Sequence, residues 1–149
     1  PKAARAFSVL GGHIRNKSDL DGRLRELAIL QVGWLARSPY EFSHHVKIGY
    51  DFGVSQADIH AMIAETDGQE SELEPLAKLV LRAAREMTLD GAASQATFDA
   101  LSEHLTNDLI LELFIAIAFY NGVVRLLGSV GIDVEPDYQK YLDQFPFPD

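Results

Sequence analysis

The sequence predicts an all-α protein, a bundle of about six to seven helices. Apolar residues recur at spacings of three and four along almost the whole chain, whereas no segment alternates apolar and polar residues between hairpin turns. The chain has 149 residues, of which 47% are hydrophobic, enough for one core and too few for two. We therefore expect a single domain over residues 1–149.

Composition and charge disfavour several classes of function. The chain has 13 basic and 22 acidic residues and a net charge of −9, which disfavours binding to nucleic acid or to an anionic membrane. It contains no cysteine, which excludes disulfides, thiolate metal sites and a cysteine nucleophile. No secretory signal is recognisable after Pro1, so we expect a cytoplasmic location, and we expect a few residues to precede Pro1.

The first two helices follow from the apolar spacing. We expect a first helix over residues 3–11 and a second from Ser18 or Asp19 to about Arg37. Residues 24–35 of the second helix are apolar on nearly every side, which predicts a position at the centre of the bundle.

The third helix has the clearest start signal. Ser38 can be its N-cap, Pro39 its first residue, and Glu41 stands where a capping box places an acidic side chain. Gly53 is typical of a left-handed helix end, and Ser55 of the N-cap of a fourth helix.

Three more helices are expected downstream, over residues 73–89, 94–104 and 106–128. The apolar stretch 109–132 has the length of a membrane span, but its polar residues and glycines favour a helix in a core or a subunit interface. Residues 133–149 form an acidic, aromatic tail, which we expect to wrap a surface or a neighbouring subunit without adding a core element.

The most unusual local group is the segment Tyr40–His45, with one carboxylate and two imidazoles within a turn and a half of helix. Glu41 and His45 are four residues apart and share a face. A carboxylate beside an imidazole raises the basicity of the imidazole, as a general acid or base near neutral pH requires. Alternatively, Glu41 only closes the capping box, and one of the two histidines points to solvent.

Cofactor sites have little support. Glu41 and His44 have the E-x-x-H spacing of di-iron bundles, but such sites need a second motif that this sequence lacks. There is also no phosphate-binding glycine loop and no G-x-S-x-G motif. We therefore expect neither a metal nor another cofactor.

A second informative pair is Glu26 and Arg125, each within an apolar helix where an unpaired charge is costly. They can form an ion pair between two core helices. Alternatively, Glu26 faces a cavity together with Glu41 and His45.

Four segments stand out as a set: Leu24–Leu30 (LRELAIL), Ser38–His45 (SPYEFSHH), Gly53–Ser55 (GVS) and Phe119–Arg125 (FYNGVVR). This combination resembles the carboxymuconolactone decarboxylase family, which includes the alkylhydroperoxidase D-like (AhpD-like) branch. The resemblance implies an AhpD-like helical bundle that assembles as a trimer or hexamer.

The resemblance also implies positions for a proton relay. In the peroxidase branch a C-x-x-C motif precedes a histidine by four residues, and a glutamate lies one helix earlier. His45 and Glu26 take the histidine and glutamate positions, whereas Ser38 and Glu41 fall where the two cysteines would be. Because neither can perform thiol exchange, the decarboxylase branch is the better analogy.

The expected function is therefore a carboxymuconolactone decarboxylase-like lyase or isomerase, acting by acid–base chemistry on a small carboxylated metabolite. The alternative is an oligomeric small-molecule binding or partner module of the same fold. The expected catalytic residues are Glu26, Glu41 and His45, and the expected substrate-binding residues are Ser38, Tyr40, His44 and Arg125. A homo-oligomer is expected as well, since the seventh helix and the tail carry more apolar surface than one bundle can cover.

Overall fold

A computed structural model describes residues 1–148, which form eight α-helices and one short 3-10 helix, with no strand among them. The prediction of an all-α fold is confirmed. The elements are α1 (Lys2–Lys17), α2 (Gly22–Leu35), α3 (Pro39–Asp51), α4 (Gln56–Thr66), α5 (Pro75–Leu89), α6 (Gln95–Ser102), α7 (Asn107–Val130), η1 (Pro136–Tyr138) and α8 (Gln139–Gln144).

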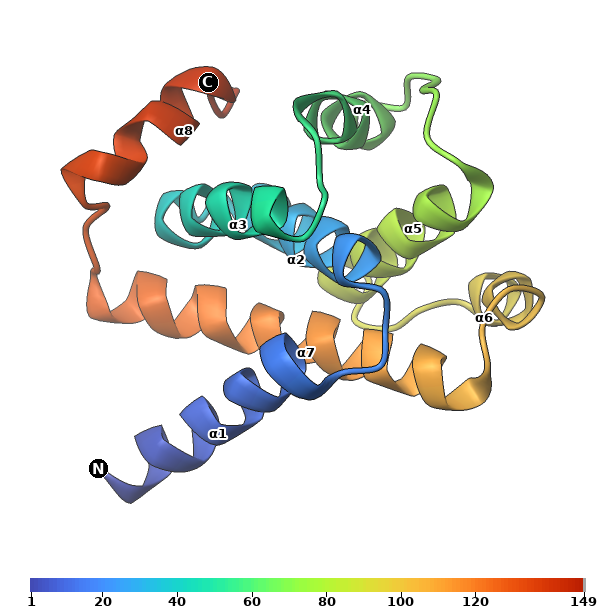
Figure 1. Cartoon of the computed structure of the whole chain (residues 1–149), viewed down its shortest axis with the longest axis horizontal. Coiled ribbons are helices and arrows are strands. Elements are labelled where there is room, and N and C mark those ends of the chain that lie inside the picture. Colours follow the sequence, from blue (N-terminus) through green and yellow to red (C-terminus); the bar gives the residue numbers. More distant parts are fainter. Residues whose placement is uncertain (149) are drawn as a thin grey trace.

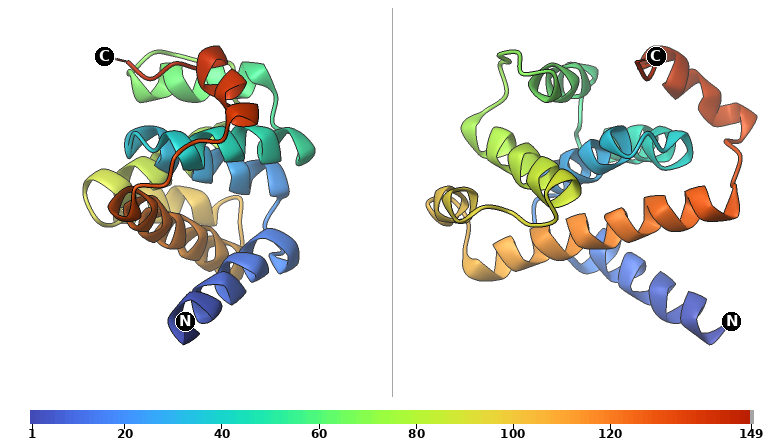
Figure 2. Two further views of the ribbon diagram at one scale, coloured as in Figure 1. Left: turned by 90° about the vertical axis from the view of Figure 1, so that its left-hand side faces the viewer. Right: turned by 180° about the vertical axis from the view of Figure 1, so that it is seen from behind.

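Helix α2 lies at the centre of the fold, as its apolar sequence predicts. It packs against α3, α5 and α7 (Figure 1), and every residue from Leu24 to Trp34 is buried. Helix α1 packs mainly against α7 and projects from the body of the molecule in both views of Figure 2. A central α2 means that any charged side chain on it must find its partner inside the protein.

Side-chain caps define the starts of several helices. Ser55 caps α4 by accepting a hydrogen bond from the backbone N–H of Asp58, whose carboxylate accepts one from the Ser55 N–H in return. The same carboxylate also pairs with Arg23 at 2.6 Å and so ties α4 to α2. Ser94 and Thr106 cap α6 and α7, since the side-chain oxygen of each accepts a hydrogen bond from the backbone N–H three residues further on.

Helix α1 is longer than predicted. Its sequence contains two consecutive glycines, Gly11 and Gly12, which suggest a helix end, but the helix continues to Lys17. Gly11 is instead a packing position, since a Cβ there would lie 3.0 Å from the ring of Phe119 on α7. The glycine therefore lets the two helices approach closely.

The tail differs from its prediction too. It contains η1 and the short helix α8, which packs on α3, and Phe145 is fully buried in the core. The ring of Phe147 stacks on Trp34 with the ring centroids 4.9 Å apart. The expectation that the tail adds no core element is therefore wrong, because its aromatic side chains complete the core beside α2 and α3.

Helix α7 is long and apolar enough to cross a membrane, judged by length and composition only. Its best 18-residue window has a mean hydropathy of 1.8, and 33% of that window is buried in the structure. A central helix of a water-soluble bundle meets the same criterion, so the criterion by itself is weak evidence.

Replacing Ser55 with alanine removes the α4 cap, so we expect the free energy of unfolding to fall by about 1 kcal/mol. Urea unfolding followed by circular dichroism measures the change. Ser8→Ala is the matched control, because Ser8 lies within exposed α1 and bonds only to the carbonyl of Ala4. Equal stability of the Ser55 variant and the wild type would contradict the assigned cap.

Candidate active site

Three acid–base side chains from α2 and α3 meet in the core. His45 Nδ1 lies 2.6 Å from Glu26 Oε2, and His45 Nε2 lies 2.9 Å from Glu41 Oε1. Because carboxylates only accept hydrogen bonds, both ring N–H groups donate when the imidazole is protonated. Glu26 is completely buried and His45 is 3% exposed, so this bridge between the two helices is dry.

The carboxylates control the protonation of His45. Burial by itself lowers the pKa of the imidazole, but the hydrogen bonds to Glu26 and Glu41 and their charges outweigh it and raise the pKa to about 9. At neutral pH His45 is therefore an imidazolium between two carboxylates.

Arg25 extends the row of charges on the side of Glu26. Its Nε lies 3.2 Å from Glu26 Oε1, and its guanidinium lies 4.4 Å from the ring centroid of Phe52. The charges alternate in sign along the row Arg25, Glu26, His45, Glu41. Their sum is therefore zero when His45 is protonated. This balance is what permits so many ionised groups in a buried position.

The opposite end of the row reaches a cavity. Glu41 lines a hollow of about 200 Å³ between α1, α3 and α7, which also includes Tyr120, Arg15 and the apolar side chains of Phe7 and Phe119. Within residues 1–148, Glu41 Oε2 has no hydrogen-bond partner. Glu41 is therefore the member of the row that a small molecule in this cavity can touch.

Tyr120 packs beside the row from α7. Its ring stands edge-on to the imidazole of His45, with the centroids 4.8 Å apart at 81°. Its hydroxyl is buried and has no hydrogen-bond partner in the described part of the chain. Burial, followed by the charges of Glu41 and Glu26, raises the pKa of the phenol well above its usual value. The phenol therefore stays protonated and keeps a proton to donate.

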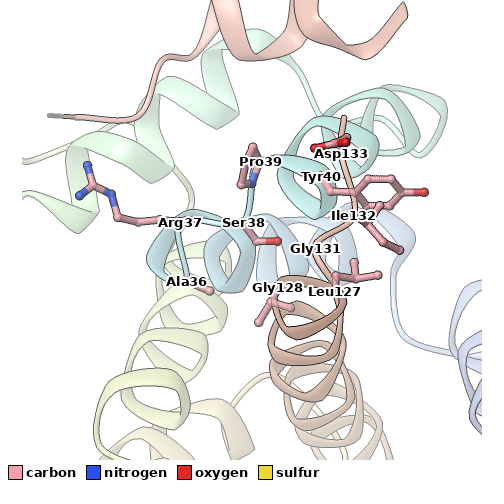
Figure 3. Close-up of a pocket in the computed structure, with 11 residues that line it drawn as sticks. Ala36, Arg37, Ser38, Pro39, Tyr40, Leu127, Gly128, Gly131, Ile132 and Asp133 are labelled. Atoms are coloured by element: carbon pink, nitrogen blue, oxygen red, sulfur yellow. The ribbon is translucent and has the colours of Figure 1, made fainter. Parts of the chain in front are cut away.

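Two of the expected substrate-binding residues lie in a neighbouring cavity of about 250 Å³ (Figure 3). Ser38 and Tyr40 line it, and the side chain of Arg37 extends away from them. Tyr40 and Leu127 line both cavities, so they form the partition between them.

His44 points away from the row of charges and contacts the tail. Its Nδ1 lies 2.8 Å from the carbonyl oxygen of Tyr40, and its Nε2 lies 3.3 Å from Glu135. Its ring is stacked between those of Tyr40 and Tyr138. Of the two adjacent histidines, only His45 faces the two carboxylates.

Two interpretations from the sequence are corrected here. Arg125 is exposed and bonds to Asn121, so it forms no ion pair with Glu26, whose partners are Arg25 and His45. Glu41 closes no capping box, since Ser38 makes no side-chain cap and Glu41 Oε1 faces His45 instead. In both cases a nearer buried partner takes the carboxylate.

Arg15 at the cavity is a residue that sequence reasoning missed. It lies on α1, beyond the predicted end of the first helix, and no pattern in the sequence links it to residues 26–45. Arg15 follows Gly11 by four residues, so the two share one face of α1. Extending the predicted helix past Gly11 would have placed Arg15 on the side that faces α7.

The described residues contain no group of three histidine, aspartate or glutamate side chains arranged to hold a metal ion. Glu26 and Glu41 bind opposite nitrogens of His45, so the three do not converge on one point. The expectation that the protein needs no cofactor stays a prediction.

Comparison in sequence identifies one family. Residues 1–71, which include Glu26, Glu41 and His45, match the model of the carboxymuconolactone decarboxylase family. No curated protein matches the chain.

Comparison of folds extends over more than nine-tenths of the chain. A protein of unknown function from Agrobacterium tumefaciens, provisionally assigned as the antioxidant defence protein AhpD, superimposes with a TM-score of 0.78 at 19% identity, over 91% of this chain and 92% of its own. A cysteine-to-alanine variant of the debrominase Bmp8, in complex with 2,3,4-tribromopyrrole, gives 0.82 at 19% identity, over 97% and 76%. The AhpD core of a peroxidase-related protein from Ralstonia eutropha gives 0.75 at 18% identity, over 95% and 74%.

At these identities the superpositions establish the fold alone. The chain is a cysteine-free protein of the AhpD-like fold whose residues 1–71 match the model of the carboxymuconolactone decarboxylase family.

Proposed function

We propose that the protein is a carboxymuconolactone decarboxylase-like lyase or isomerase that acts by acid–base chemistry on a small carboxylated, lactone-like or aromatic-catabolism metabolite. One observation carries the proposal: Glu41 lines a cavity, and its Oε1 lies 2.9 Å from Nε2 of a buried imidazolium. A general acid or base needs this combination of access to the substrate and a linked proton reservoir.

In the proposed reaction Glu41 moves the proton and His45 supplies it. For a decarboxylation, the bond from carbon to the carboxylate breaks, carbon dioxide leaves, and the electron pair passes into the adjacent carbonyl. Glu41 then delivers to the carbon a proton drawn from His45 Nε2, while Glu26 fixes the ring through Nδ1. Solvent restores that proton. For an isomerisation, Glu41 removes a proton from one carbon and returns it to another.

Arg15 supports the choice of a carboxylated substrate. The net charge of −9 repels an anion, so a site for one needs a local cation. Arg15 is the cation that lines the cavity, and apolar side chains of α1 and α7 surround the remaining space. Arginine is suited to the role because it can donate two hydrogen bonds to one carboxylate.

The second candidate function is a binding or partner module without catalysis. The complete burial of Glu26 and the near-complete burial of His45 favour it, because a buried ion pair can serve structure alone. Binding of a small carboxylate without any turnover would support this alternative.

Glu41→Gln tests the proposal directly. The amide cannot exchange a proton at neutral pH, so we expect kcat for carbon dioxide release from carboxymuconolactone to fall at least about a hundredfold. Glu103→Gln is the matched control, since Glu103 is exposed at the end of α6. Equal turnover by the wild type and the Glu41 variant, or no turnover by the wild type, would overturn the catalytic assignment.

The protonation of His45 makes the stability depend on pH. Folding raises the pKa of His45 from 6.5 to about 9, so its contribution is fully present below pH 6.5 and is lost as the pH rises through 9. The expected loss in the free energy of unfolding across this range is about 3 kcal/mol.

His45→Gln supplies the comparison, because glutamine does not titrate. Urea unfolding at a series of pH values should give a steeper decline for the wild type than for the variant between pH 7 and 10. Parallel curves would mean that His45 is not the titrating group.

We also propose that the chain self-associates through the outer faces of α1 and α7. Exposed apolar residues on α7 occur as two pairs with a spacing of four, Leu111 (59% exposed) with Ile115 (39%) and Leu126 (49%) with Val130 (61%), and Val9 on α1 is 73% exposed. An apolar strip of this length on two adjacent helices is typical of an interface.

Light scattering at micromolar concentration should therefore give a mass that is a multiple of 16.5 kDa. Leu111→Glu places a charge in the proposed interface and should lower that mass. Leu89→Glu is the control, because Leu89 is 64% exposed at the end of α5. A monomeric wild type would contradict the interface.

A further inference from the structure

The buried hydroxyl of Tyr120 is a polar group that the fold does not use. Tyr120 is 2% exposed, and its hydroxyl has no partner within residues 1–148. A buried donor without a partner is costly, and such groups are rare in folded proteins. The ring contacts with His45 and Phe119 would be made equally by phenylalanine. Packing therefore explains the ring of Tyr120 and leaves its hydroxyl without a structural role.

The position of the side chain suggests what the hydroxyl is for. Tyr120 lines the same cavity as Glu41 and Arg15, and the charges of both act on its phenol. The cavity thus combines a proton-transfer group, a cation and an uncommitted neutral donor, with apolar walls between them.

We infer that Tyr120 is a catalytic residue whose hydroxyl donates a hydrogen bond to a carbonyl oxygen of the bound substrate. The inference rests on the proposed function and narrows its substrate class to small acids that carry a carbonyl next to the breaking bond besides the carboxylate bound by Arg15, such as lactone acids or oxo acids. A substrate that is decarboxylated carries a further carboxylate, which leaves as carbon dioxide. Arg15 binds the carboxylate that is retained, and Tyr120 binds the carbonyl oxygen.

The chemistry of both proposed reactions requires such a donor. When a C–H or C–COO⁻ bond next to the carbonyl breaks, its electron pair moves into the carbonyl and the oxygen becomes an enolate. A fixed donor at that oxygen stabilises the charge where it develops. Glu41 transfers the proton to or from carbon, so Tyr120 keeps its own proton throughout.

The carbonyl oxygen of the ligand reaches the Tyr120 hydroxyl when one wall of the cavity moves outward. The hydroxyl is closed to solvent in the free protein, and α1 forms the outer wall through Phe7, Ser8, Gly11 and Arg15. Within one chain only Gly11 and Ile14 of α1 are buried, so α1 is the wall that the rest of the same chain holds least firmly.

Two aromatic acids test the inference without any turnover. The anion of 4-hydroxy-3-nitrobenzoate carries a carboxylate and a phenolate oxygen that imitates an enolate, whereas 3-nitrobenzoate has the carboxylate alone. Calorimetric titration of Tyr120→Phe should show at least tenfold weaker binding of the phenolate than the wild type and binding of 3-nitrobenzoate within twofold. Arg15→Gln should weaken both ligands.

Stability supplies a second measurement. Because Tyr120→Phe removes only a donor without a partner, its melting temperature should equal or exceed that of the wild type. A lower melting temperature would mean that the hydroxyl already has a structural partner, and the inference would fail. It would fail equally if the wild type binds neither acid, or if Tyr120→Phe binds the phenolate as tightly as the wild type.

The Glu41→Gln variant separates this inference from the proposed function. It retains Tyr120 and Arg15, so it should still prefer the phenolate over 3-nitrobenzoate. Preference for the phenolate without turnover by the wild type would overturn the catalytic assignment and leave the binding role of Tyr120 standing. Turnover by the wild type without any effect of Tyr120→Phe on phenolate binding would overturn the role of Tyr120 alone.

Discussion

The imidazolium of His45 between two carboxylates is the interaction on which the rest of the site depends. It joins the central helix α2 to α3 through a hydrogen bond of 2.6 Å to Glu26 and an ion pair of 2.9 Å with Glu41. Three ionised groups in a core would be costly in isolation, and removing any one of them would leave an uncompensated charge. Arg25 completes the balance on the side of Glu26. The row can exist because each charge has a neighbour of opposite sign.

The two ends of this row differ, because one end is buried and the other lines a cavity. At one end Arg25 is buried against the ring of Phe52. At the other end Glu41 lines a cavity whose opposite wall is the loosely packed helix α1. Of the four charged groups in the row, Glu41 is therefore the one that lines this cavity. Burial of Glu26 and His45 fixes the geometry of the row, and the cavity gives a small molecule access to Glu41.

The absence of cysteine separates this chain from thiol chemistry without altering its fold. The similar structures include a protein assigned as AhpD and a debrominase, which shows that the helical arrangement accompanies different assignments. In this chain Ser38 lies at a separate cavity, and Glu41 at the entrance to the charged row. The helical bundle fixes where the site residues lie, and the identity of the side chains there determines the chemistry.

Most of the helices and the pairing within the charged row could be predicted from the sequence, although α1 runs past its predicted end and α8 was not expected. Caps such as Ser55 and Ser94 act through neighbouring backbone groups, and the pairing of Glu41 with His45 follows from a spacing of four on one helix, so local information is sufficient. Helix packing placed Arg125 on the surface, Arg15 at the cavity and Phe145 in the core. Those outcomes depend on which helices pack together, and contacts between residues distant in the chain leave no periodic signal in the sequence.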